Sequence, residues 1–312
     1  LEGPTVTSAG ERLLVPMARS WLACLALASE LAALSGTRLL EADLSDSATY
    51  AVRVNGKVWL ESAPLRIFAE GRWHDSATSG LTPTGVKRYN GSDVLGSFTC
   101  INVSWSVPGT ELLLHTSLSV YADGQTAIFT QELPAGASST DASRPELPEG
   151  TTVDAGAYPP FLSFPAFRAS TGLLPQLGYV LWQGVFARAV SGTNAPKHLQ
   201  GLSSSGPVVL FDGTYASLVV SPMDNFKNAV HSHSTDRDAW EAGVSSEVEA
   251  VPTGFVHRTL LVAGTSIIGA MDAWGLALRK AYGTRRLDEE DPVTNYLSYW
   301  TDNGAYYYGD AW

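Results

Sequence analysis

Cysteine is nearly absent from this sequence, with Cys24 and Cys100 as the two examples in 312 residues. Two cysteines supply neither a disulfide framework nor a cysteine-based metal site, so no cofactor is expected from them. Charged residues are also few, at 16%, and 20 Lys and Arg against 31 Asp and Glu give a formal net charge of −11. Because affinity for nucleic acid depends on clustered Lys and Arg, and no basic run exceeds a pair, we expect no nucleic-acid partner.

Long apolar runs are missing as well, since nothing approaches the ~20 apolar residues that a membrane helix needs, and no membrane span is expected. What is present is apolar material in shorter pieces: 45% of the residues are hydrophobic and 10% are aromatic. That content suffices for a large core and excludes wholesale disorder. Seven of the aromatic residues fall within the last seventeen positions, which marks the C-terminal end as unusual.

The N-terminal residues 1–35 read as an upstream segment followed by a signal peptide. A short basic start at Met17 to Ser20 precedes an apolar stretch from Trp21 to Ala28, and small residues follow near Ser35. This pattern predicts a secreted or vacuolar protein, although Glu30 keeps an ordinary amphipathic helix open as the alternative. On a secreted chain, the sequons that begin at Asn90 and Asn102 would be glycan acceptors.

Residues 36–264 predict a large antiparallel β-sandwich. Asn55-Gly56 joins two β-rich runs, and Asp123-Gly124 joins two more within 112–131, so two hairpins are expected. Further strands are expected at 96–107, 178–189, 206–211, 217–221 and 255–262. About ten strands without intervening helices favour a sandwich over a βαβ arrangement. The Ser-, Pro- and Gly-rich stretch at 136–156 is expected to be a surface loop inside this domain.

Residues 265–292 predict a linking helix and a polar connection. Ile267, Met271, Trp274 and Leu278 recur at helical spacing and form one stripe, which we interpret as core packing against a sheet. Thr265 or Ser266 can cap the start of the helix, and Gly283 can end it. The fold class expected for the whole chain is therefore mainly β, with one helix after the sandwich.

The block at 293–312 combines a short strand with a polar turn: Tyr296 to Trp300 is apolar, and Thr301-Asp302-Asn303-Gly304 follows it. Acid and amide side chains suit sugar hydroxyl pairs, and aromatic rings stack on the apolar faces of pyranose rings. A tyrosine-rich hairpin with Asn303-Gly304 as its turn explains the residues equally well.

The order of these parts, together with the Tyr299-to-Tyr308 block, resembles glycoside hydrolases in which a (β/α)8 barrel follows a sandwich, especially the α-galactosidase and raffinose-synthase group. The stretch from Ser221 to Lys227 also resembles a strand-end motif of these sandwiches. The resemblance implies a carbohydrate substrate, with Asp302, Trp300 and Asn303 as substrate-binding residues on the first strand of an incomplete barrel. Retaining glycosidases need two carboxylates; the family bears them on later strands, so no catalytic residue is assigned.

Two alternatives stay open from the sequence. A noncatalytic carbohydrate-binding β-sandwich would use exposed Trp and Tyr rings, and a purely structural sandwich would bind nothing. His231-Ser232-His233 places two imidazoles on one side of an extended segment, a spacing that metal sites use. With no acid or cysteine completing a ligand set, we interpret this segment as a solvated loop and expect no metal.

Overall fold

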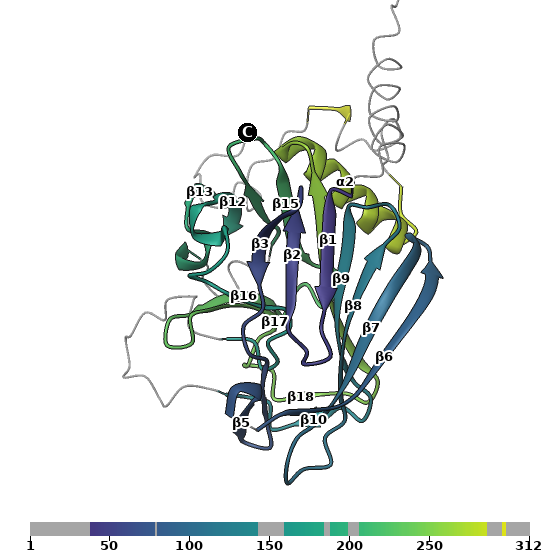
Figure 1. Cartoon of the computed structure of the whole chain (residues 1–312), viewed down its shortest axis with the longest axis vertical. Helices are drawn as coiled ribbons and strands as arrows, with labels where there is room; N and C mark the ends of the chain where they lie inside the picture. The colour runs from purple at the N-terminus through teal and green to yellow at the C-terminus, as the bar shows by residue number, and fades with distance from the viewer. Residues whose placement is uncertain are drawn as a thin grey trace, which may run out of the picture.

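The computed structural model describes residues 38–78, 80–142, 159–183, 188–198, 206–285 and 295–297. Its dominant element is one nine-stranded antiparallel sheet, in the order β13-β12-β14-β15-β19-β9-β8-β7-β6 (Figure 1). The strands of this sheet are β6 (Thr82–Asp93), β7 (Gly96–Ser106), β8 (Leu114–Tyr121), β9 (Thr126–Leu133), β12 (Gly178–Gln183), β13 (Arg188–Thr193), β14 (Val208–Phe211), β15 (Ser217–Pro222) and β19 (Phe255–Gly264).

A second layer covers one face of this sheet and is built from two three-stranded sheets. Their strands are β1 (Leu40–Leu44), β2 (Tyr50–Val54), β3 (Lys57–Glu61), β11 (Ala166–Arg168), β16 (Ala229–Ser234) and β17 (Ala239–Val244). A bridge between Ser62 and Phe167 connects the two sheets. Two further two-stranded sheets are formed by β4 (Arg66–Ala69) with β5 (Arg72–Asp75) and by β10 (Ala137–Ser138) with β18 (Ala250–Val251). The expected β-sandwich is therefore confirmed.

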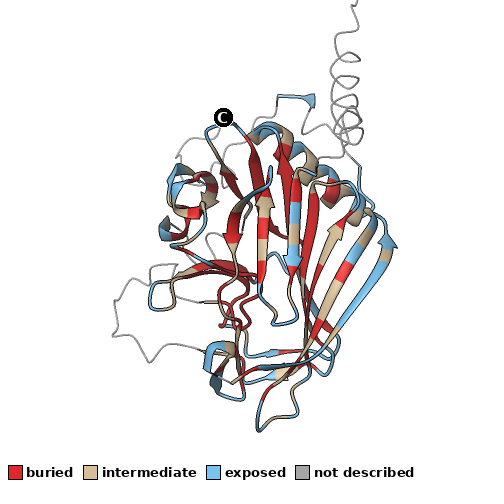
Figure 2. Cartoon of the chain, in the orientation of Figure 1, coloured by how far each residue is buried: buried red, intermediate tan, exposed pale blue. Residues whose placement is uncertain are grey.

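The sandwich core lies between the two layers, as the buried strands in Figure 2 show. Phe129 on β9 contacts three rings from the second layer: Tyr50 at 5.0 Å, Phe164 at 5.3 Å and Phe167 at 6.0 Å between centroids. All four side chains are buried. Because aromatic side chains bury the most apolar area per residue, this cluster joins the two layers into one hydrophobic unit.

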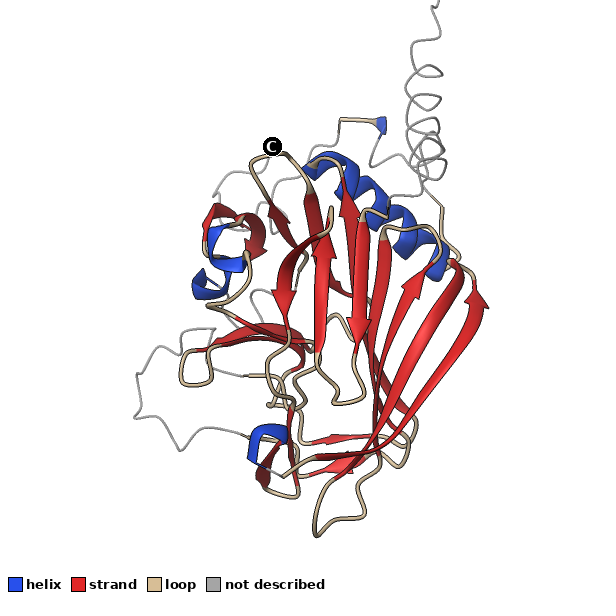
Figure 3. Cartoon of the chain, viewed as in Figure 1, coloured by secondary structure: helices blue, strands red, loops and turns tan. Residues whose placement is uncertain are grey.

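Alternate residues of the central strands face the opposite side, where the helix α2 (Ile267–Ala281) lies across the sheet (Figure 3). On β19, Leu261 belongs to the sandwich core, whereas its neighbours Leu260 and Val262 pack with the helix. The Ser266 hydroxyl accepts a hydrogen bond from the Gly269 amide at 3.0 Å and caps the helix. The predicted helix is confirmed, and so is its packing stripe, since its four residues contact the sheet face.

Both predicted hairpins are present. Asn55 and Gly56 adopt positive φ angles of 50° and 72° between β2 and β3, as a two-residue hairpin turn requires. The Asp123 carboxylate accepts hydrogen bonds from the amides of Gln125 and Thr126, each at 3.0 Å, and so fixes the turn between β8 and β9. The sequence pattern missed β6, a twelve-residue edge strand without buried residues. Much of the predicted 136–156 loop lies outside the described residues.

Candidate functional site

The three predicted substrate-binding residues, Asp302, Trp300 and Asn303, lie outside the described residues, and so does most of the predicted barrel strand. They stay a prediction. Four other groups of polar side chains in the described part of the chain are candidates for a binding or catalytic site. These are a strand-end motif beside α2, a buried histidine cluster, a buried ion-pair network, and a groove at one edge of the large sheet.

The strand-end motif, residues 221–227, leads from the end of β15 toward β16 and contacts the neighbouring strand β19. The Asp224 carboxylate accepts hydrogen bonds from the Arg258 backbone amide at 2.8 Å and from Arg258 Nε at 2.7 Å, and His257 Nδ1 lies 3.2 Å from it. Burial alone would raise the pKa of Asp224, but the hydrogen bonds from His257 and Arg258 outweigh burial and hold that pKa below its ordinary value. Asn225 adopts a positive φ of 53° and donates to the Val256 carbonyl at 2.9 Å.

The same motif holds the end of α2. The Tyr282 hydroxyl donates to the Met223 carbonyl at 2.5 Å, and the Tyr282 ring lies 6.1 Å from the Phe226 ring. The Asp224 carboxylate and the Asn225 amide of this strand-end motif are thus hydrogen-bonded within the fold. Among the described residues, these contacts of the motif hold β15, β19 and α2 together, and we call the motif the clasp. The contacts account for its polar side chains, so no ligand is needed to explain them.

A histidine cluster is buried inside the sandwich. The interpretation of His231 and His233 as a solvated loop was wrong, because both lie on β16 and His231 is 1% exposed. Sequence alone missed that the segment pairs with β17, where His231 faces Ala242. Gln131 donates to the Ala242 carbonyl at 3.3 Å and faces His257 across β9 and β19. Within the described parts of the chain, no group of three or more His, Cys, Asp or Glu side chains is placed to hold a metal ion.

The His231 imidazole makes the stability of the sandwich sensitive to acid. Burial, followed by the nearby His257, lowers the pKa of His231 from 6.5 to about 4. Since the unfolded chain binds this proton more readily than the folded chain, stability is lost as the pH falls from 6.5 toward 4. At about 1.4 kcal/mol per pH unit, the loss approaches about 3 kcal/mol at pH 4.

We therefore expect His231→Leu to flatten the decline in unfolding free energy between pH 7 and pH 4, measured by urea denaturation at several pH values. His233→Leu, on the same strand but partly exposed, is the matched control and should leave most of the decline. An unchanged slope in His231→Leu would show that this imidazole does not cause the acid sensitivity.

An ion-pair network ties the β4–β5 hairpin to β17. Glu241 is fully buried and receives Arg66 Nη2 on one oxygen and Arg237 Nη1 on the other, each at 2.7 Å. Arg237 Nη2 also lies 3.1 Å from Asp75 Oδ2, and the Arg66 guanidinium lies 4.2 Å from the centre of the Trp73 ring. Burial raises the pKa of Glu241, and the two guanidinium groups counteract that effect. Sequence analysis missed this group because its members are up to 175 residues apart.

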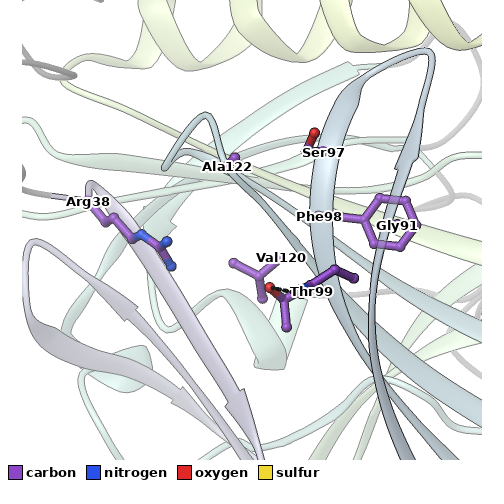
Figure 4. A pocket seen from close by; sticks show the side chains of 8 residues that line it. Arg38, Gly91, Ser97, Phe98, Thr99, Val120 and Ala122 are labelled. Atoms are coloured by element: carbon purple, nitrogen blue, oxygen red, sulfur yellow. Dashed lines mark hydrogen bonds between the residues drawn. The ribbon is translucent and has the colours of Figure 1, made fainter.

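A groove of about 400 Å³ opens at the edge of the large sheet, at the end of β6 and β7 (Figure 4). Its polar side chains are Arg38, Asn90, Ser97 and Thr99, which come from the start of β1 and from the β6–β7 hairpin. Val120 on β8 supplies an apolar wall, and Figure 4 shows Arg38, Thr99 and Val120 around the same space. No ion pair to Arg38 is present among the residues that the structure describes.

The two predicted glycan acceptors differ in their surroundings. Asn90 lies on the exposed edge strand β6 and lines the groove. Asn102 lies on β7, between β6 and β8, and is half-buried. Cys100 is a buried free thiol. In the described residues, no helix has the length and apolar character needed to cross a membrane.

No family model matches the chain, and no curated protein matches it. Among solved structures, the chain is similar to an α-N-acetylgalactosaminidase from Bifidobacterium bifidum, NagBb, seen as a quadruple mutant with a TM-score of 0.46 and as a GalNAc complex with a TM-score of 0.48. The sequence identity is 8% in both comparisons, and each covers 79% of this chain. The chain spans 38% of the length of these neighbours.

Proposed function

We propose that this chain is the N-terminal region of a secreted or vacuolar glycoside hydrolase that acts on α-galactoside-like glycosides. The observation that carries the proposal is the order of parts. A large antiparallel sandwich ends in β19, α2 follows directly and covers the outer face of the sheet, and the sequence continues into the Tyr-Trp-Thr-Asp-Asn block.

In this proposal the catalytic carboxylates come from residues beyond Trp312, one as nucleophile and one as acid and base. Asp302 accepts hydrogen bonds from substrate hydroxyls, Trp300 forms an apolar wall for the sugar ring, and Asn303 pairs with a further hydroxyl. The 312-residue chain alone is then inactive as a hydrolase.

The test uses the longer product of the coding sequence and two substrates, an aryl α-galactoside and an aryl α-N-acetylgalactosaminide. We expect hydrolysis of at least one substrate. Because a hydrogen bond to a charged group contributes about 1.5–3 kcal/mol, Asp302→Ala should lower kcat/KM by roughly 10- to 100-fold. Asp288→Ala, in the polar connection before the block, is the control and should leave kcat/KM unchanged.

Three results would count against these assignments, the last of them provided that the melting temperature of the variant matches that of the parent. A stop codon directly after Trp312 in the intact transcript, or a longer product without activity on either substrate, contradicts the hydrolase proposal. Equal kinetics for Asp302→Ala and the parent remove Asp302 from the substrate site but leave the enzyme class standing.

A noncatalytic carbohydrate-binding sandwich is the second candidate, and exposed aromatic rings favour it. Tyr215 is 72% exposed and Tyr89 is 49% exposed, so both rings are open for stacking on sugars. Binding of the 312-residue chain to a glycan array without hydrolysis, lost in Tyr215→Ala or Tyr89→Ala, would support this candidate over the hydrolase.

A further inference from the structure

The amide of Asn90 is already oriented by the fold. Its Oδ1 accepts a hydrogen bond from the Thr99 hydroxyl at 3.1 Å, across the β6–β7 pair where the two residues face each other. No hydrogen bond from Asn90 Nδ2 to another described residue is present. Since Oδ1 is held by Thr99, Nδ2 is the amide atom left for a new bond. Nδ2 is also the atom to which an N-linked glycan is attached in an Asn-Gly-Ser sequon.

The groove beside Asn90 has the size and chemistry of a small saccharide site. Its volume of about 400 Å³ falls within the range of small-ligand sites, roughly 300–1,000 Å³. The Arg38 guanidinium and the Ser97 hydroxyl can bind sugar hydroxyls and an acetamido carbonyl, and Val120 faces the same space as an apolar surface. No Asp or Glu lines the groove, so its polar side chains mainly offer donors, which suit the hydroxyl and acetamido oxygens of a sugar.

We propose that Asn90 carries an N-linked glycan and that the first sugar of this glycan sits in the groove between Arg38, Ser97 and Val120. In the attachment reaction, C1 of the first sugar forms a bond to Nδ2 while its C1–O bond to a lipid-linked diphosphate donor breaks. The diphosphate leaves with the bonding electron pair, and Nδ2 releases one proton to the transferase. The proposal rests on passage of the chain through the secretory pathway, and it is independent of the proposed hydrolase activity.

Asn102 is the unfavourable acceptor. It lies opposite Lys87 on β6 and Ser117 on β8, so strands flank it on both sides, and its side chain is half-buried. A glycan there would have to stand between two neighbouring strands, whereas Asn90 is paired on one side only. Asn90 lies instead near the turn of the β6–β7 hairpin, on an exposed edge strand. The structure assigns the modification to Asn90 alone.

A glycan on Asn90 would also protect the open edge of the nine-stranded sheet. β6 is the last strand of the nine-stranded sheet, and over its twelve residues its outer edge is open in the described structure. Open edges of this length pair with strands of other chains and promote aggregation. The sugars that follow the first one extend beyond the groove and hinder that pairing, as charged residues and prolines do on other edge strands.

The first experiment translates the full chain in the presence of endoplasmic-reticulum microsomes. We expect a mobility shift of one glycan that is sensitive to endoglycosidase, absent from Asn90→Gln and unchanged in Asn102→Gln. Absence of any shift overturns the proposal. A shift that survives Asn90→Gln, or a shift of two glycans in the parent, overturns the assignment to Asn90 alone.

The second experiment tests whether the sugar occupies the groove, using protein secreted from eukaryotic cells. The glycosylated parent should melt about 2 to 4 °C above Asn90→Gln, which corresponds to roughly 1 kcal/mol for a domain of this size. In the Arg38→Ala background, this difference between glycosylated and unglycosylated protein should shrink by half or more. Lys87→Ala, on β6 but outside the groove lining, is the control and should keep the full difference. An equal difference in all three backgrounds would show that the sugar does not sit against Arg38.

Discussion

Glu241→Ala is expected to destabilise the sandwich by about 3–5 kcal/mol, the range for removing one partner of a buried ion pair. The carboxylate is fully buried between Arg66 and Arg237, so its removal leaves Arg66 in a largely desolvated site without its counter-ion and leaves Arg237 with Asp75 as its remaining partner. Urea denaturation at pH 7, followed by tryptophan fluorescence and far-UV circular dichroism, measures the loss. Glu241→Gln should lose less, because its amide oxygen still accepts one hydrogen bond.

The control for this prediction is an exposed ion pair. Arg53 lies 2.7 Å from Asp43, and the Asp43 side chain is 80% exposed. Asp43→Ala should therefore cost less than about 1 kcal/mol. If Glu241→Ala and Asp43→Ala cost the same, the buried network does not hold the β4–β5 hairpin onto β17.

Phe129→Ala is the second large effect, also expected at about 3–5 kcal/mol. The side chain is fully buried and contacts Tyr50, Phe164 and Phe167, which belong to the opposite layer. Its removal creates a cavity between the two layers, so near-UV and far-UV circular dichroism should report the same lowered midpoint. Two separated transitions would show instead that the layers unfold independently.

Leu113→Ala provides the comparison for Phe129→Ala. Leu113 lies in the connection between β7 and β8, is 52% exposed and does not belong to the core. Its substitution should shift the urea midpoint little, by an amount within about 0.5 kcal/mol. A loss in Leu113→Ala as large as that in Phe129→Ala would mean that the effect is not specific to the interlayer cluster.

The local features of the fold were predictable from the sequence wherever a short-range signal decided them. Asn55-Gly56 and Asp123-Gly124 formed the expected turns, and Ser266 capped the expected helix. β6 was missed because neither face of an exposed edge strand carries the apolar alternation that marks a half-buried strand. β16 was misread because His231 and Ser232 are polar, and they are buried only where the hairpin of β16 and β17 packs into the sandwich.

The candidate sites were harder to predict, because each joins residues that are far apart in the chain. Arg66 and Glu241 meet only after the second layer has assembled, and no local pattern at either residue indicates the other. A charged residue in an otherwise apolar strand, as in Trp240-Glu241-Ala242, was the available signal. The groove likewise forms where Arg38 approaches the β6–β7 hairpin, and the sequon at Asn90 was its one visible trace.

The clasp at the end of α2 fixes more than the helix. Because Tyr282 is anchored to Met223, and the amides of Gly283 and Thr284 bond back to carbonyls of the last helical turn, the direction in which the main chain leaves the sandwich is set up to Thr284. Any rotation of later residues relative to the sandwich must therefore take place about backbone bonds that follow Thr284. The chain therefore leaves the sandwich from a fixed position and in a fixed direction at Thr284.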